Sequence, residues 1–190
     1  SEIGDVRLED ATPLPFRPGR TVSFMFPGIP ELPIRTPVPI APVDAMLDEV
    51  DRAITAGAVE RLVMAYAAKR WHAGLLARIE STHAVGIRGH GARLDHPERV
   101  ALALAPPSMI TLARNARRAT TEQPSSKTQH QLHELLGAPS APAATPVIVA
   151  DRVHAVLVVG DTIEGTLQES LAELDRLADA LGAAYVRFSR

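Results

Sequence analysis

The residues best suited to chemistry in this sequence are its seven histidines and a group of arginines, because no cysteine is present. A chain without cysteine has no thiolate nucleophile, no disulfide and no cysteine-ligated zinc site. His130 and His133 are three residues apart, which places both on one face of a helix. His90 and His96 flank Arg93 in a second group. Four histidines could hold a metal ion, but no carboxylate or thiolate completes a recognised pattern, so we predict neither a metal site nor a cofactor.

The main concentration of basic residues is Arg114, Arg117 and Arg118, with Arg93 and Arg99 upstream. Such a run is usually a solvated helix face, where single charges contribute little. The alternative is a site for a small anionic ligand or an acidic partner, since arginine binds carboxylates and phosphates with two parallel hydrogen bonds. The candidate ligand-binding residues are His90, Arg93, His96, Arg114, Arg117 and Arg118.

No residues form the pattern of a catalytic site. Ser108 follows two prolines and lacks the G-x-S-x-G turn of a nucleophile elbow, so we expect it to cap a helix. No acid/base pair or activated nucleophile emerges elsewhere in the sequence. The sequence therefore predicts a protein that is not an enzyme and has no catalytic residues.

The composition is ordinary for a globular chain, with 46% hydrophobic and 22% charged residues. A net charge of −2 and an aromatic content of 4% disfavour nucleic acid as a partner, since neither a basic surface nor a stacking platform is indicated. No run of 18 apolar residues and no signal peptide is found. We therefore expect a cytoplasmic protein with no membrane partner.

The elements that must position these side chains are clearest in the last third of the sequence. Two β-branched runs between Thr145 and Val159, separated by Asp151-Arg152, predict a hairpin. Thr166 and Glu169 form a capping box before a helix whose apolar residues recur every three or four positions as far as Phe188. We expect this helix and hairpin to pack together, with Leu157 and Leu174 buried.

The rest of the sequence predicts further helices and strands in a characteristic order. The expected elements are two helices or one kinked helix over 44–70 broken at Gly57, a hairpin over 73–89, a short strand within 100–105, and helices over 109–118 and 126–136. Pairs of strands separated by helices favour an α+β fold with an antiparallel sheet. We expect the long terminal helices to cover one face of the sheet and an irregular helical crossover to cover the other.

Residues 1–42 differ from the rest in composition, because they contain nine of the sixteen prolines. Proline-dense segments form extended polyproline II structure, so we predict a tail or linker over 1–42 and a domain over 43–190. The run Thr21–Phe26 is more apolar than a spacer needs. It could add as a strand to the edge of a sheet.

The predicted order of elements resembles a GAF domain over about residues 44–188. Residues 145–161 are similar to the closing hairpin of that family, and the helix with Leu174, Leu177 and Leu181 is similar to its closing helix. Residues 84–91 and 105–108 resemble a divergent GAF-like subgroup found in deltaproteobacterial regulatory and secretion-type multidomain proteins. The Asn-Lys-Phe-Asp-Glu motif of cyclic-nucleotide GAF domains is absent, as is a cysteine for bilin attachment. The resemblance therefore implies neither of those ligands.

The resemblance implies a non-enzymatic regulatory or protein-interaction domain, part of a larger bacterial signalling or assembly system. The alternative is a small-ligand sensor with a pocket between the sheet and residues 92–136. An apolar interior with an exposed apolar patch would favour the first, and a polar cavity would favour the second. GAF-like domains often pair through their terminal helices, so we expect a protein partner or a homodimer, with Leu177 facing outward. The candidate interface residues are Leu62, Tyr66, Leu177 and Ala184.

Overall fold

The computed structural model describes residues 43–189, and the predicted tail over 1–42 lies outside the described residues. The helices are α1 (Val43–Arg52), α2 (Ala56–Arg70), α3 (Met109–Ala116), α4 (Lys127–Leu135) and α5 (Leu167–Phe188), with the 3-10 helix η1 (Pro97–Arg99). The strands are β1 (Gly74–Ile79), β2 (His83–His90), β3 (Ala101–Ala103), β4 (Ala143–Val149) and β5 (Arg152–Val159). Both predicted hairpins and the terminal helices are present, which confirms the α+β class.

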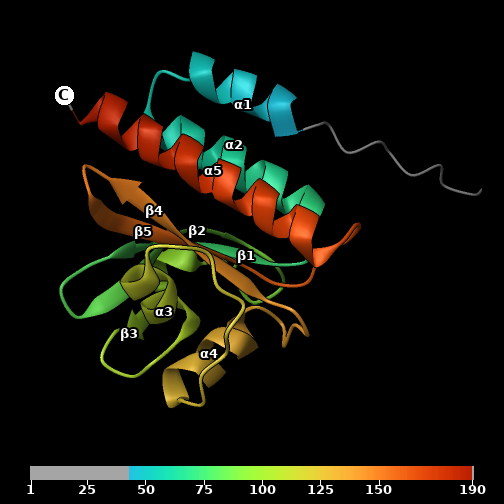
Figure 1. Ribbon diagram of the computed structural model, residues 1–190, viewed down its shortest axis with the longest axis vertical. Coiled ribbons are helices and arrows are strands. Elements are labelled where there is room, and N and C mark those ends of the chain that lie inside the picture. The colour runs from blue at the N-terminus through green and yellow to red at the C-terminus, as the bar shows by residue number, and fades with distance from the viewer. Residues whose placement is uncertain (1–42, 190) are drawn as a thin grey trace, which may run out of the picture. The chain divides into compact units, whose positions relative to one another are not determined.

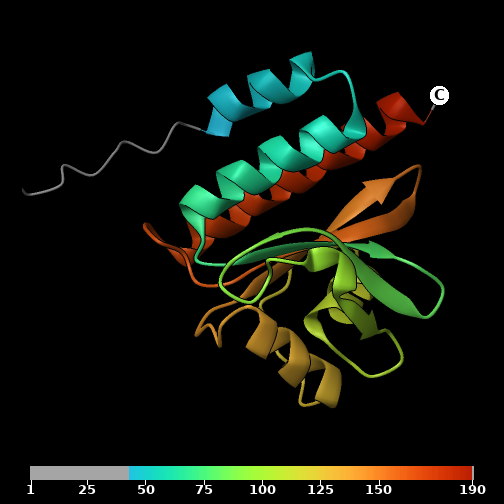
Figure 2. The same cartoon turned by 180° about the vertical axis from the view of Figure 1, so that it is seen from behind.

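The five strands form one sheet in the order β3-β2-β1-β5-β4, and every neighbouring pair is antiparallel. The first and last hairpins meet at the centre, where β1 pairs with β5 and Leu76 lies opposite Leu157. Helices α2 and α5 cover one face of the sheet, and the crossover with α3 and α4 covers the other (Figures 1 and 2). This arrangement confirms the predicted layers.

The core between the sheet and the terminal helices is apolar. Leu157 of β5 and Leu174 of α5 are both 0% exposed, as predicted. Leu76 of β1 and Val63 of α2 belong to the same buried cluster. Helix α1 lies outside α2 and α5 as a further layer, on the side away from the sheet (Figures 1 and 2).

The opposite face of the sheet has its own apolar core. Side chains alternate along a strand, so Leu75 and Val158 point to this face while their neighbours point to the terminal helices. Met109 and Ile110 of α3 and Leu132 of α4 cover them. Because both faces are covered, β1 and β5 have continuous apolar runs instead of alternating ones.

Side-chain caps begin the helices where the sequence indicated. The Ser108 side chain accepts a hydrogen bond from the Thr111 amide, and the Ser108 amide donates one to the Thr111 hydroxyl. Thr166 and Glu169 form the predicted capping box at the start of α5. Ser126 caps α4 by accepting from the amide of Gln129. These caps satisfy amides that have no partner inside the helix.

Two predicted boundaries are wrong by a few residues. The first helical segment breaks at Ala53–Thr55, not at Gly57, because Thr55 is extended and its side chain accepts from the Ala58 amide. The last hairpin turns at Ala150-Asp151, one residue before the predicted Asp151-Arg152. Both turn residues have positive φ, 45° and 65°, as a two-residue hairpin turn requires. Alanine rarely adopts that conformation, so composition gave no signal for it.

Two glycines are needed because the backbone of another element lies too close for a side chain. A Cβ at Gly86 of β2 would lie 2.1 Å from the carbonyl oxygen of Pro97, so glycine lets η1 pack against the strand. A Cβ at Gly182 would lie 2.5 Å from the carbonyl oxygen of Ile148. Glycine in the middle of α5 therefore allows this helix to lie directly on β4, despite its lower helix propensity.

Candidate interaction site

Helices α2 and α5 are tied together near both of their ends by matching polar groups. Near one end, the Glu173 carboxylate accepts from Arg70 Nε at 2.8 Å and from the Tyr66 hydroxyl at 3.2 Å. Near the other end, the Glu60 carboxylate accepts from the Tyr185 hydroxyl at 3.0 Å, and Arg88 Nε of β2 lies 3.4 Å away. Each glutamate thus faces one tyrosine and one arginine, and the two helices run antiparallel.

The two tyrosines of these ties are buried, whereas their glutamate partners are partly exposed. Burial, together with Glu173, raises the pKa of Tyr66 to about 12. Burial and Glu60 likewise raise the pKa of Tyr185. Both phenols therefore keep the proton that they donate at neutral pH. The face of α2 that meets α5 is committed to contacts within the chain.

The loop before α5 reinforces the Arg70 end. The indole of Trp71 donates to the Ser170 hydroxyl at 2.7 Å, and both residues are buried. The Arg70 guanidinium also donates to the carbonyl of Glu164. Buried polar groups satisfied in this way specify one alignment of the helices, because a shift would leave them unpaired.

Three of the four candidate interface residues are inside the domain. Tyr66, Leu177 and Ala184 are 6%, 0% and 3% exposed, so the expectation that Leu177 faces outward is wrong. The physical reason is that both apolar rows of α5 are already used within the chain. One row packs on the sheet, and α2 and α1 cover the other. Only Leu62 remains partly exposed.

Leu62 belongs to an apolar depression on the outer side of α2, here called the α1–α2 surface. Ile54, in the loop between the two helices, is 84% exposed. The depression encloses about 630 Å³ and has charged residues at its rim. The apolar residues of the α1–α2 surface are Ala53, Ile54, Ala58, Leu62 and Ala65. An exposed isoleucine beside a leucine and three alanines is a candidate site for protein contact.

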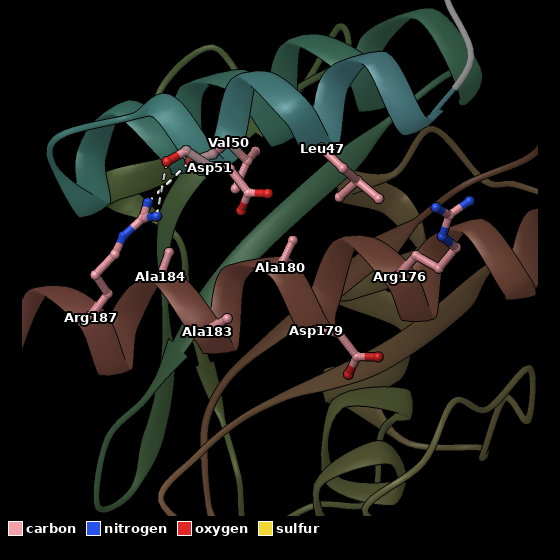
Figure 3. A pocket seen from close by; sticks show the side chains of 9 residues that line it. All are labelled: Leu47, Val50, Asp51, Arg176, Asp179, Ala180, Ala183, Ala184 and Arg187. Carbon is pink, nitrogen blue, oxygen red and sulfur yellow. Dashed lines mark hydrogen bonds between the residues drawn. The ribbon is translucent and has the colours of Figure 1, made fainter.

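A second open region, the α1–α5 groove, lies between those two helices (Figure 3). Arg176 of α5 pairs with Asp44 near the start of α1. Arg187 donates to the carbonyls of Val50, Asp51 and Ala53 at 3.0, 3.1 and 3.2 Å, which caps the end of α1. Between these contacts the helices leave about 490 Å³. The groove is lined by Leu47, Val50, Asp51, Arg176, Asp179, Ala180, Ala183, Ala184 and Arg187.

The six candidate ligand-binding residues are spread over the domain. His90 lies at the end of β2 beside Gly74, where a Cβ would be 2.6 Å from its Nε2 atom. That nitrogen has no hydrogen-bond partner among residues 43–189, and burial lowers the pKa of His90. Arg93 donates to the carbonyl of Glu134 at 3.1 Å. His96 Nδ1 lies 3.2 Å from the Glu98 carboxylate, and both side chains are exposed.

The three arginines after Leu112 also fail to converge. Arg114 is exposed on α3. Arg117 follows that helix in a left-handed conformation and pairs with Asp151 at 3.1 Å. Arg118 lines a separate pocket of about 400 Å³ that includes Leu171 of α5. The structure therefore places these six residues around the domain and does not gather them into one pocket.

The histidine pair on α4 does not form a chelating site. His130 Nδ1 lies 2.7 Å from the carbonyl of Ser126, and His133 Nε2 lies 3.0 Å from that of Pro139. The two rings are therefore directed toward opposite ends of the helix. Within the described part of the chain, no three His, Cys, Asp or Glu residues are placed to hold a metal ion.

Apolar side chains pack between the sheet and residues 92–136, and a small pocket of about 250 Å³ lies beside Gln129, His130 and His133. Six large residues there are at most 1% exposed. They are Leu75, Leu94, Leu102, Met109, Ile110 and Leu132. The interior on this side of the sheet is therefore mainly apolar. Across residues 43–189, every helix is too short or too polar to span a bilayer.

Solved structures share this fold. The chain is similar to residues 122–287 of a methyl-accepting chemotaxis protein, with TM-score 0.62 and 14% identity, covering 76% of this chain and 96% of that one. A GAF domain from a phosphoenolpyruvate-protein phosphotransferase of Coxiella burnetii gives TM-score 0.62 and 17% identity, covering 76% and 90%. The GAF-B domain of DevS from Mycobacterium smegmatis gives 0.53 and 21%, covering 70% and 95%.

These comparisons confirm a GAF-like fold, and at such low identities they show the fold alone. No protein-family model matches the sequence, and no curated protein matches it. The resemblance to the deltaproteobacterial subgroup stays a prediction.

Sequence reasoning missed most of the α1–α2 surface, although a signal was present. Ile54, Ala58, Leu62 and Ala65 follow helical spacing, separate from the row that α2 buries. A helix that continued from 44 to Gly57, as the sequence predicts, would place Ile54 on the same face as the buried Met46 and Val50. Ile54 is exposed because α1 ends before it, at Arg52.

Proposed function

We propose that this domain is a non-enzymatic regulatory module that self-associates through the α1–α2 surface within a larger bacterial signalling or assembly system. The observation that carries the proposal is Ile54, which is 84% exposed beside the partly buried Leu62. Two structures with this fold are parts of a chemotaxis protein and of a phosphotransferase. We extend to this chain the idea of a GAF-like domain that serves a larger protein.

Self-association gives these side chains a partner that the single chain lacks. In a two-fold symmetric dimer the same patch meets itself, so Ile54 of one copy can pack near Leu62 of the other. Ala58 and Ala65 are small, which lets two helices approach closely. Glu49, Arg52 and Arg61 at the rim provide both signs of charge, so a rotated copy can align opposite charges.

Sedimentation of the full chain at tens of micromolar tests the proposal. The unmutated chain is expected to form a dimer, and Ile54→Arg and Leu62→Glu to give monomers, because each would bury an unpaired charge. Ile163→Arg is the matched control, since Ile163 is 43% exposed but lies outside the α1–α2 surface. A monomer for the unmutated chain, or a dimer that both variants retain, would contradict the proposal.

A further inference from the structure

In the α1–α5 groove, the two helices are in contact near both ends of α1 but not in the middle. Arginines of α5 anchor both ends of α1, yet the middle of the pair is open. The floor on the α5 side consists of alanines, and Ala180 and Ala184 point toward α1 in Figure 3. Leu47 and Val50 provide apolar contacts from α1. Small side chains on one wall allow a third backbone to approach closely.

The α1 side of this groove is acidic, because α1 has Asp44, Asp48, Glu49 and Asp51 against one basic residue, Arg52. Arg176 is paired with Asp44, and the guanidinium of Arg187 is engaged by three carbonyls. No ion pair within residues 43–189 involves Asp51 or Asp179, which also line the groove. The Asp51 carboxylate extends between the two helices in Figure 3. A ligand with one apolar side and positive charge next to it would complement the alanines of α5 and the acidic wall of α1.

We propose that the α1–α5 groove binds a basic amphipathic helix of a partner protein. An apolar row on that helix would lie against Ala180, Ala183 and Leu47, as in other helix-in-groove complexes. Lysine or arginine side chains beside the row would reach Asp51 and Asp179. The α1–α5 groove is separate from the α1–α2 surface. A domain that self-associates through the α1–α2 surface could therefore bind a second partner in the groove.

A second copy of this chain is a poorer occupant for the groove. Helix α1 has four acidic residues and a single basic one, Arg52. A symmetric pair formed here would bring two acidic helices together, and like charges in contact oppose association. Charge complementarity thus favours a basic partner over self-association at this surface.

The test uses fluorescence anisotropy with the full chain and a designed helix of about 18 residues containing leucine, alanine and lysine. A second peptide has the same apolar row with glutamate in place of lysine. Two variants of the chain address the groove. Ala183→Trp fills it from an exposed position, and the double variant Asp51→Asn with Asp179→Asn removes its charge at constant size. Asp95→Asn, at an exposed acid in the loop after β2, is the matched control.

The lysine peptide is expected to bind, and the glutamate peptide to bind at least about tenfold more weakly. Ala183→Trp and the double asparagine variant should each lower the affinity for the lysine peptide by about tenfold or more, while Asp95→Asn leaves it unchanged. Equal affinity for all variants, or no binding of the lysine peptide, overturns the proposal. So does loss of self-association in Ala183→Trp, since a second copy would then occupy the groove. Self-association is tested by sedimentation of Ile54→Arg, and helix binding is tested with the peptides. The proposed function and the binding of a basic helix can therefore fail separately.

Discussion

Helices α1 and α2 both pack beside α5, but in very different ways. Helix α2 meets α5 through an apolar face and through the partly buried hydrogen bonds of Glu60 and Glu173. Helix α1 is held by Arg176 and Arg187 near its two ends and leaves an open groove between them. Helix α1 also buries Val43, Met46 and Val50 in the shared core, but its contact with α5 is open in the middle, whereas the contact of α2 with α5 is closed.

This difference indicates where the domain has surface left for recognition. The inner faces of α2 and α5 are fully used by the fold, which is why Leu177 and Tyr66 cannot serve a partner. Helix α1 does not cover its neighbours completely. Two depressions therefore remain open beside it, the α1–α2 surface around Ile54 and the α1–α5 groove. The layer with the more open packing is therefore the one that we expect to bind other molecules.

The largest expected effect comes from the core beneath α5. Leu174→Ala removes a fully buried side chain and should destabilise the domain by about 2–5 kcal/mol in denaturant melts. Leu47→Ala, on the partly exposed side of α1, should cost less than about 1 kcal/mol. Similar losses for both variants would mean that α1 belongs to the core as much as α5 does.

The next effect compares two arginines that each pair with a carboxylate. The Arg70 side chain is 8% exposed, and its removal leaves Glu173 with the phenol of Tyr66 alone, so Arg70→Ala should cost about 2–3 kcal/mol. The Arg176 side chain is 46% exposed, and Arg176→Ala should cost about 0–1 kcal/mol. Urea denaturation measures both, and equal costs would contradict the distinction between the α2 and α1 contacts.

A smaller effect is expected from the arginine that caps α1. Arg187→Ala removes three donors from the last carbonyls of that helix and should cost about 0.5–1.5 kcal/mol. Amide hydrogen exchange should become faster in α1 and stay unchanged in α2, because only α1 loses contacts. Faster exchange throughout both helices would show that they open as one unit.

The elements were predictable from the sequence because their signals are local. Capping boxes at Ser108 and Thr166 and the apolar periodicity of α5 depend on neighbours a few residues away. The hairpin turn was placed one residue late because Ala150 adopts a left-handed conformation that its type does not indicate. Local patterns therefore give the elements and their faces more reliably than they give the ends.

The candidate site was less predictable because it depends on which faces of α2 and α5 are covered by other helices of the same chain. The resemblance to GAF-like domains predicts that the terminal helices pair with another copy, but the sequence does not show that α1 and α2 of the same chain cover α5. Leu177 and Ala184 are therefore buried within the chain instead of forming the predicted interface. The lack of convergence of the six ligand candidates is likewise a property of the tertiary structure, since spacing cannot show where Arg93 and Arg118 meet other elements.

The most direct test of the claim that recognition occurs at the α1 layer is hydrogen exchange of the full chain at low and high concentration. We predict that residues 53–65 exchange more slowly in the concentrated sample, because self-association covers the α1–α2 surface. Residues 92–136 should exchange equally in both samples, since the crossover packs only within its own chain. Identical exchange at the two concentrations, or protection confined to residues 92–136, would contradict the account.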